Sequence, residues 1–336
     1  MIHHKQFKSL YDLLERFPTE LSCHEYIASQ RWGGYMECPF EGCSGDQAYV
    51  FSDGIRYKCK CCKRKYTVKT GSFLEGTHLQ LRKWLIAVYL VMHKKGISSH
   101  QLAKDVGVTQ KTAWFMLGRI RQVFANDVLK DQPLDGVVQL DETFVGGKNI
   151  NRHYDKKVQG NQGRSFKDKT PVFGMLRQQE YEYVDKVHPS GVVIKELVIK
   201  RPSVLICHVV RDTTVRNIQP HIMRSVIPAT TLVSDEWKAY KGLHYTYNHK
   251  VVDHGRHNYV TDDGYTTNAL EGAWKALKAS IKSIHHYVTP RHLNRYVQEF
   301  VFRYNYRNFD IPQQMNVVFG NMHFRIKYRD LIKKAA

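Results

Sequence analysis

Two acidic residues stand where apolar strands are expected to end. Asp141 closes "VVQLD" and Asp235 closes "TLVSD", and each follows residues suited to a buried strand. Two carboxylates side by side at strand ends are costly unless a cation or another partner neutralises them. A third acid, Glu271, lies on the helix predicted for "NALEGAWKALK". Lys278 follows it by nearly two helical turns, so both residues are expected on one face.

Three carboxylates from two strands and one helix can hold a pair of divalent cations. Such a pair serves in-line phosphoryl transfer, because one ion activates the attacking oxygen and the other stabilises the leaving oxygen. Oxygen ligands favour Mg²⁺ or Mn²⁺ over zinc. Each acid also has a simpler explanation: a strand-end cap for Asp141, a helix N-cap for Asp235 and a surface position for Glu271. Only the three together favour a catalytic site.

A second group of potential metal ligands lies near the start of the chain. Five of the seven cysteines fall between Cys38 and Cys62, which in a reducing compartment favours metal binding over disulfides. A C-x4-C pair and a C-x2-C pair with 15 residues between them fit one tetrahedral zinc ion. The pattern predicts a zinc ribbon with Cys38, Cys43, Cys59 and Cys62 as ligands. Cys61 is surplus and could replace Cys59 or Cys62 in a poorer geometry.

The composition favours a polyanionic partner. The 336 residues include 51 Lys and Arg against 31 Asp and Glu, which gives a formal charge of +20 and a pI of about 9.6. Nucleic acid is the commonest partner of such a chain. The longest apolar run, Trp84 to Met92, is too short to span a membrane, and the start lacks the features of a signal peptide. We therefore expect an intracellular protein, in a bacterial cytoplasm or nucleoid or a eukaryotic nucleus.

The sequence predicts a multidomain protein. Two N-terminal helices are expected in residues 1–30, the zinc ribbon in 31–76 and a helical segment in 77–130. Strands alternating with helices predict an α/β domain in 131–310, and residues 311–336 are assigned to a C-terminal tail. The second N-terminal helix, in "SCHEYIASQRW", is expected to open with Ser22 and Glu25 as a capping box.

Five stretches of the α/β domain read as strands, and another is a weaker candidate. They are "GVVQLDETFVGG", "PVFGMLR", "EYEYVDKVH", "SVLICHVVRD" and "TTLVSD", with "VVDHGRHNYV" as the weaker candidate. Cys207 in the fourth of these is expected to be a core residue. Helices are predicted in "TVRNIQPHIMRSVI", "NALEGAWKALKASIKSI" and "PRHLNRYVQEFVFRYNYR". Another helix is expected directly after Asp235.

The stretch "ISSHQLAKDVGVTQKTAWFMLGRIRQVF" predicts two helices joined by a tight turn. The turn is at Gly107 and Thr109 caps the second helix, which is the shape of a helix-turn-helix whose second helix enters the major groove. The residues that would then face DNA are Gln110, Lys111 and Thr112, with Arg119 and Arg121 as further candidates. The alternative is an ordinary helical bundle with a core stripe of Trp114, Leu117, Ile120 and Phe124.

Residues 146–169 hold seven Lys or Arg against two Asp and little that could pack into a core. We expect a mobile loop that lies along DNA phosphates, with a simple solvated loop as the alternative. Its candidate DNA contacts are Lys148, Arg152, Lys156 and Lys157.

Three blocks of the sequence resemble a known family as a set. "LDETFVGGK", "SDEWKAY" and "TNALEGAWKALK…HHYVTPRHLNRYVQEFVFRYNYR" look like the DDE transposases of the ISXO-like insertion sequences and their eukaryotic Merlin relatives. That family also carries an N-terminal zinc ribbon and a helical DNA-binding segment, so the resemblance covers nearly the whole chain. The C-x4-C spacing and the extra thiol in "KCKCC" depart from the usual ribbon pattern.

The resemblance implies an RNase H-like catalytic domain with Asp141, Asp235 and Glu271 as the metal-binding triad. It also implies that Lys278 contacts a DNA phosphate. Some members are described with asparagine at the third position, so Asn268 is considered as a residue that supports the ligand or as a helix cap, and Glu271 is kept as the ligand.

The implied activity is that of a cut-and-paste transposase with two Mg²⁺ or Mn²⁺ ions and a structural zinc. Such an enzyme binds the terminal inverted repeats of its element, hydrolyses a phosphodiester and joins the freed 3′-OH to target DNA. Binding two ends implies at least a homodimer. The alternatives are a domesticated DNA-binding protein that no longer cuts and an RNase H-like nuclease that cuts without joining.

Overall fold

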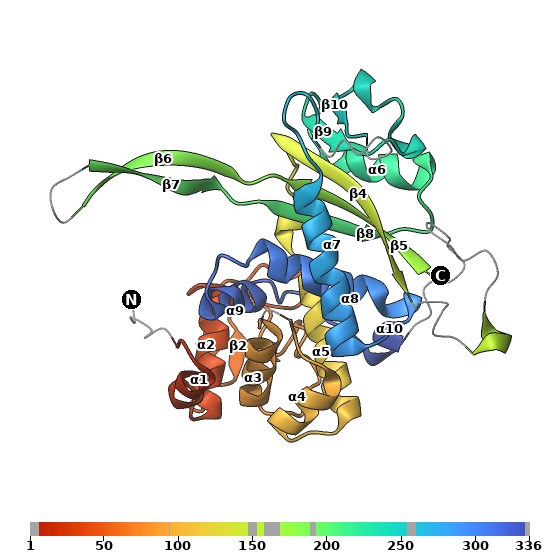
Figure 1. Cartoon of the computed structure of the whole chain (residues 1–336). Coiled ribbons are helices and arrows are strands. Elements are labelled where there is room, and N and C mark those ends of the chain that lie inside the picture. Colours follow the sequence, from red (N-terminus) through yellow and green to blue (C-terminus); the bar gives the residue numbers. More distant parts are fainter. Residues whose placement is uncertain are drawn as a thin grey trace. The chain divides into compact units, whose positions relative to one another are not determined.

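The computed structural model of this chain divides into two compact units (Figure 1). Unit 1 comprises residues 1–127 together with 306–336, and unit 2 comprises residues 128–305. The C-terminal residues therefore fold with the N-terminal region, whereas the sequence analysis assigned residues 311–336 to a separate tail. The structure describes residues 7–93, 95–146, 153–157, 169–188, 193–253 and 260–332.

Unit 1 combines helices with a small ribbon of three short strands. The ribbon is antiparallel in the order β1-β2-β3, and α9 packs against α2. The elements are α1 (Leu10–Arg16), α2 (Glu20–Trp32), β1 (Ala48–Val50), β2 (Tyr57–Cys59), β3 (Lys65–Tyr66), α3 (Leu81–Val91), α4 (Ser99–Val106), α5 (Gln110–Ala125), α9 (Ile311–Gly320) and α10 (Tyr328–Ile332).

The second N-terminal helix begins earlier than the sequence analysis predicted. Thr19 is its N-cap: the Thr19 hydroxyl accepts a hydrogen bond from the Ser22 N–H (3.1 Å), and the Ser22 hydroxyl accepts one from the Thr19 N–H (3.2 Å). The expected capping box of Ser22 with Glu25 is therefore wrong, since a capping pair one turn earlier satisfies the same free N–H groups.

Helices α4 and α5 meet at a left-handed glycine. Gly107 ends α4 with φ of 62°, a conformation that costs glycine less than any other residue. Thr109 then caps α5 by accepting a hydrogen bond from the Thr112 N–H (3.2 Å). The two helices, the turn and the cap are all where the sequence analysis placed them.

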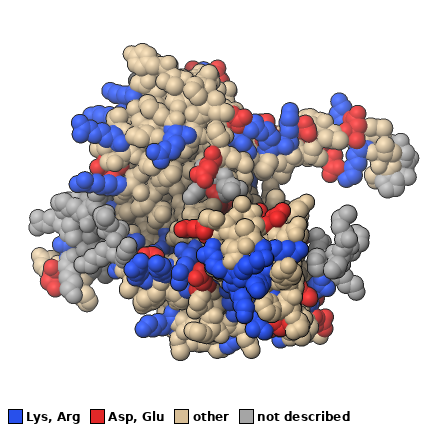
Figure 2. Space-filling model, turned by 180° about the vertical axis from the view of Figure 1, so that it is seen from behind, with Lys and Arg blue, Asp and Glu red and all other residues tan. Residues whose placement is uncertain are grey.

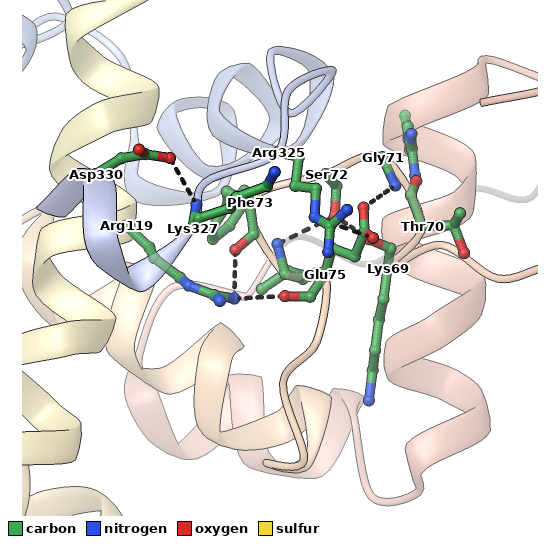
Figure 3. Close-up of polar contacts among 12 residues, drawn as sticks. Lys69, Thr70, Gly71, Ser72, Phe73, Glu75, Arg119, Arg325, Lys327 and Asp330 are labelled. Atoms are coloured by element: carbon green, nitrogen blue, oxygen red, sulfur yellow. Dashed lines mark hydrogen bonds and ion pairs between the residues drawn. The ribbon is translucent and has the colours of Figure 1, made fainter. Parts of the chain in front are cut away.

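A buried arginine of α5 holds the segment that links the ribbon to α3 (Figure 3). The Arg119 guanidinium donates hydrogen bonds to the carbonyl oxygens of Phe73 (2.8 Å) and Glu75 (3.0 Å). The Glu75 carboxylate accepts a hydrogen bond from the Gly71 N–H (2.9 Å) and forms an ion pair with Arg325 (3.2 Å). A polar group that is buried needs such partners, and Arg119 finds them in backbone carbonyls.

Arg119 and Arg121 therefore do not face DNA. Their side chains are only 5% and 3% exposed, because both lie on the face of α5 that packs into unit 1. Their basic type suggests a surface position, and that expectation is wrong for both residues. The expected core positions Leu117, Ile120 and Phe124 are buried, whereas Trp114 is only partly buried.

Unit 2 contains a five-stranded mixed sheet in the order β10-β9-β4-β5-β8. Strand β5 runs antiparallel to β4 and β8, whereas β9 runs parallel to β4 and β10. The strands are β4 (Val137–Gly146), β5 (Lys169–Arg177), β8 (Val204–Val209), β9 (Thr231–Ser234) and β10 (Asn248–Val251), and a separate pair is formed by β6 (Glu180–Val187) and β7 (Val193–Arg201).

The helices of unit 2 cover both faces of the five-stranded sheet. On one face, Val138, Leu140 and Phe173 pack with residues of α6; on the other, Val172 and Leu205 pack with residues of α7 and α8. Cys207 belongs to this second core, as expected. The helices are α6 (Val215–Ser225), α7 (Asn268–Ser280) and α8 (Pro290–Asn305), and the short helical segments are η1 (Val128–Asp131), η3 (Tyr154–Lys156), η4 (Lys238–Tyr240), η5 (Leu243–Tyr245) and the π-helical η7 (Ile281–His285).

Three details of unit 2 differ from the sequence analysis. Strand β10 ends at Val251, the first residue of the stretch predicted as a strand, and residues 254–259 of that stretch lie outside the described residues. The segment after Asp235 leads into the 3-10 helix η4 instead of an α-helix. Strand β7, which the sequence analysis did not predict, pairs with β6.

Candidate functional site

Asp141 lies within β4, and Asp235 directly follows β9, the neighbouring parallel strand. The register pairs Gln139 of β4 with Val233 of β9, and each aspartate follows two residues later. Because side chains alternate along a strand, both aspartates point to the face of Gln139, and neighbouring strands lie about 4.8 Å apart. The Gln139 side-chain carbonyl accepts a hydrogen bond from the Leu270 N–H (2.9 Å) at the start of α7. Both carboxylates therefore face the helix that carries Glu271.

Asp141 accepts hydrogen bonds at both of its carboxylate oxygens. Its Oδ1 accepts a hydrogen bond from the Glu142 N–H (2.8 Å), and its Oδ2 accepts one from the Trp274 indole N–H (2.9 Å). Burial, together with the charges of Asp235 and Glu271, raises the pKa of Asp141 from 3.8 to about 6, against the opposing effect of the two hydrogen bonds. The three acids thus share one electrostatic environment.

A glycine opposite Asp141 lets the indole of Trp274 reach it. Gly174 of β5 is the register partner of Asp141. A Cβ atom at Gly174 would lie 2.5 Å from two carbons of the Trp274 ring and 3.2 Å from Leu270 Cδ1. Any side chain at this position would push α7 or its tryptophan off the sheet. Sequence reasoning missed both residues, and the only signal was a glycine in the middle of a strand.

Asp235 and Glu271 each take part in a local hydrogen bond. Asp235 Oδ1 accepts a hydrogen bond from the Trp237 N–H (3.0 Å), which closes a turn after β9 instead of capping an α-helix. Glu271 lies in the first turn of α7, where the helix dipole favours a negative charge, and Oε1 accepts a hydrogen bond from the Thr267 hydroxyl (3.4 Å). Asp141, Asp235 and Glu271 are all partly exposed, so a cation can reach them from solvent.

The three carboxylates are spread more widely than the ligands of a single ion. In the described ranges, the group of metal-binding side chains whose ligand atoms all lie within 4.8 Å of one another is formed by four cysteines and does not include these acids. Two catalytic ions lie about 3.5–4 Å apart and spread their ligands over a larger region. All three acids offer carboxylate oxygens, the ligand type that Mg²⁺ and Mn²⁺ prefer; Asp141 offers them from the middle of β4, Asp235 from just after β9 and Glu271 from the first turn of α7.

Two further residues of α7, Asn268 and Lys278, lie on either side of Glu271 in the sequence. Burial lowers the pKa of Lys278, while the Asp141 carboxylate opposes this effect, so the ammonium group lies within electrostatic reach of Asp141. Thr267 is the N-cap of α7 and Asn268 is the first helical residue, exposed to solvent. The suggestion that Asn268 caps the helix is therefore wrong.

The four cysteines Cys38, Cys43, Cys59 and Cys62 form a compact cluster that indicates a structural zinc site. The Sγ atoms of Cys38 and Cys62 are 3.6 Å apart, and those of Cys43 and Cys59 are 3.7 Å apart. A tetrahedral zinc with Zn–S bonds of about 2.3 Å requires Sγ atoms about 3.8 Å apart. Cys61 lies outside this group and is exposed.

Local contacts prepare the cysteine cluster for a cation. A hydrogen bond from Arg64 lowers the pKa of Cys62 to about 6, which favours the thiolate that binds metal. The Cys38 N–H donates to the Gly45 carbonyl (2.8 Å), and a Cβ at Gly45 would lie 2.9 Å from Cys59 Sγ. Gly45 therefore lets the first cysteine loop close over the second.

The candidate DNA contacts of α5 lie on its first turn. Gln110 and Lys111 are exposed, Thr112 is partly exposed, and the Gln110 side chain donates a hydrogen bond to the Ser99 hydroxyl (2.8 Å). On the face shown in Figure 2, Lys and Arg side chains gather over unit 1 in the lower half of the view. In the basic loop, Lys157 is exposed; Lys148, Arg152 and the side chain of Lys156 lie outside the described residues.

Comparison with known proteins gives matches to two families and to a curated relative. Residues 133–305, just over half of the chain, match the ISXO2-like transposase domain, and residues 18–65 match the transposase zinc-ribbon domain. The "Uncharacterized protein in transposable element ISH50" of Halobacterium salinarum is 29% identical over 170 residues, which cover 48% of this chain and 55% of the relative. The chain thus spans about half the length of that relative. Within the described residues, no helix is both long and apolar enough to span a membrane.

Proposed function

This chain belongs to the ISXO2-like transposase family, and we propose that it is a DDE transposase that cuts DNA at the ends of its element and joins the freed 3′-OH to target DNA. The observation that carries this proposal is the meeting of Asp141, Asp235 and Glu271 on one face of the unit 2 sheet. An acid on each of two parallel strands and a third on the helix above them would hold two divalent cations.

We propose an RNase H-like fold for unit 2, spanning much of the expected domain 131–310. The support is a mixed sheet in which three antiparallel strands are followed along the chain by two parallel ones, with helices on both faces. In this order the acids occupy the first and the fourth strand, which the sheet places next to each other.

The residues of the site have separate tasks in this reaction. Asp141, Asp235 and Glu271 bind the cations, and the Trp274 indole fixes the orientation of the Asp141 carboxylate. Bound Mg²⁺ or Mn²⁺ would activate the attacking oxygen and stabilise the leaving one. Lys278 would contact a phosphate beside the acids. Water attacks first and the 3′-OH attacks second, so the protein needs no covalent intermediate.

DNA binding is proposed for two regions. In unit 1, α4 and α5 would act as a helix-turn-helix, with Gln110, Lys111 and Thr112 facing the DNA of the terminal repeats. In unit 2, the basic loop with Lys148, Arg152, Lys156 and Lys157 would follow phosphates. Zinc on the four cysteines would hold the ribbon, and two element ends would require at least a homodimer.

A cleavage and joining assay tests the proposal. Purified protein is incubated with Mg²⁺, labelled DNA that carries the element ends and an unlabelled target duplex. We expect nicks at the ends and labelled joined products. Asp235→Asn should abolish both, whereas Glu236→Gln, the same change at the exposed neighbouring acid, should retain both.

Two results would contradict the proposal. Binding of the ends without nicking under any divalent metal would identify a protein that binds DNA without cutting. Nicking without joined products would identify a nuclease.

A further inference from the structure

The hairpin of β6 and β7 forms its own two-stranded sheet and projects from the rest of unit 2 (Figure 1). Ion pairs hold its base: Arg201 contacts Glu180 (3.1 Å) and Asp135 (2.6 Å). An isolated two-stranded sheet is marginally stable in water and normally packs one face on another layer. One face of this hairpin is therefore expected to be covered by another layer.

One face of the hairpin is apolar. The register pairs Tyr181 with Ile199, Tyr183 with Leu197 and Val187 with Val193, and alternation along the strands puts all six on the same side. Their exposed fractions lie between 45% and 70%. We name this surface the hairpin apolar face; it consists of Tyr181, Tyr183, Val187, Val193, Leu197 and Ile199.

The opposite face of the hairpin is suited to water. It alternates Val184, Ile194 and Val198 with charged residues, and cross-strand ion pairs join Lys186 to Glu196 (2.7 Å) and Lys200 to Glu182 (4.0 Å). Such cross-strand ion pairs are compatible with a solvent-exposed surface. The contrast between the two faces indicates that only the apolar one is made to be covered.

We propose that the hairpin apolar face packs against the same face of a second copy of this chain. The net charge of the hairpin favours a protein partner over DNA. Residues 180–201 contain four acids and four bases, a net charge of zero in a chain of +20, so this segment is not built to attract DNA. Figure 2 shows both signs mixed along the hairpin.

The second argument is self-complementarity at the centre of the face. Asp185 and Lys195 are register partners, flanked on both sides by the apolar side chains. When two such faces pack about a two-fold axis along the hairpin, Asp185 of each copy lies over Lys195 of the other. An isologous contact of this kind repeats every favourable interaction twice.

The area is sufficient for association. Six half-exposed side chains on each copy would bury on the order of 1,000 Å² in total, counted over both copies. This total is the lower limit for specific interfaces. The proposed function already requires at least a homodimer, and this inference deepens it by assigning the surface through which two copies associate. Association is measured without DNA or catalytic metal, so the two proposals can fail separately.

Sedimentation equilibrium of the full chain tests the proposal. We expect a monomer–dimer equilibrium in which Leu197→Glu raises the dissociation constant at least tenfold, because a charge is placed in the apolar contact. Ile194→Glu is the matched control: it makes the same change in the same strand on the opposite face, opposite Lys186, and should leave the constant unchanged. Circular dichroism confirms that both variants are folded. A chain that stays monomeric at all concentrations, or an equal effect of both variants, would overturn the proposal.

A mixing experiment separates contacts between copies from contacts within one hairpin. Asp185→Lys and Lys195→Asp each place like charges opposite one another between identical copies, so each variant alone should associate weakly. A mixture should form a heterodimer with at least tenfold tighter association, since every contact then joins a lysine to an aspartate. No gain on mixing would contradict the two-fold arrangement. Cleavage of element ends, assayed separately, reports on the proposed function alone.

Discussion

The cysteine cluster and the proposed carboxylate site are built in opposite ways. The ligands of the first lie within 25 residues of sequence, and their sulfur atoms lie at the spacing of a single tetrahedral ion. Those of the second are drawn from Asp141, Asp235 and Glu271, and they are spread over two strands and a helix. A local cluster serves folding, because metal binding supplies the stability that three short strands lack. A distributed site depends on a sheet that folds without it.

Metal removal should distinguish the cysteine cluster from the carboxylate site most clearly. Stripping zinc, or the Cys59→Ser change, should unfold the ribbon, because structural zinc contributes on the order of 10 kcal/mol to such small units. Hydrogen exchange should show the β1–β3 amides losing protection while the β4 and β5 amides keep theirs.

Cys61→Ser is the control for the zinc ligands, since Cys61 lies outside the cluster. It should retain one zinc per chain by elemental analysis. Loss of zinc from Cys61→Ser together with retention in Cys62→Ser would contradict the ligand assignment.

Gly174→Ala should damage the carboxylate site without touching its ligands. The added Cβ meets the Trp274 ring at 2.5 Å, so unfolding by urea should report a loss of about 2–3 kcal/mol, and end cleavage should fall at least tenfold. Gly272→Ala on α7 is the matched control, because its Cβ meets nothing within 4 Å. That change should leave cleavage intact and add up to about 1 kcal/mol of stability. Equal behaviour of the two variants would mean that the close approach of Trp274 is unimportant.

Asp141→Asn should change how stability depends on pH. The folded-state pKa of Asp141 is raised to about 6, so this group favours folding when protonated, and its contribution is lost as pH rises through 6. Without divalent cations, the Asn variant should be about 1–2 kcal/mol more stable than the parent at pH 7.5, and the difference should vanish near pH 4. Urea unfolding across this range measures it. Mg²⁺ should stabilise only the parent, and an advantage that persists at pH 4 would argue against a buried carboxylate.

Trp274→Phe should have the smallest effect. It keeps the ring in the core but removes the indole hydrogen bond to Asp141, a contact that lowers the pKa of the carboxyl group. We expect a loss of about 1 kcal/mol and a rise in the lower pKa of the cleavage profile. A profile identical to that of the parent would show that the indole does not orient the acid.

Much of the secondary structure was predictable from local patterns. The apolar run before Asp235 is strand β9, as expected, whereas the run before Asp141 is only the first half of β4, which continues to Gly146 and so does not end at the acid. Gly107 and Thr109 mark the turn and cap between α4 and α5. These signals are local, since they depend on alternation and on the conformational freedom of single residues. Strand β7, in "VIKELVIK", does not alternate between apolar and polar residues, because charged residues fall on both of its faces, so the period-two signal of a strand is absent.

The sequence by itself determined which residues could bind metal, since cysteine spacing and strand-end acids are chemical signals that need no partner. It also favoured a polyanionic partner through the +20 charge. Only the tertiary structure decided that Arg119 is buried against carbonyl groups, that Gly174 makes room for Trp274 and that one hairpin face is left uncovered. Each of these depends on a contact between distant segments, and residue type alone does not specify which distant segment a side chain will meet.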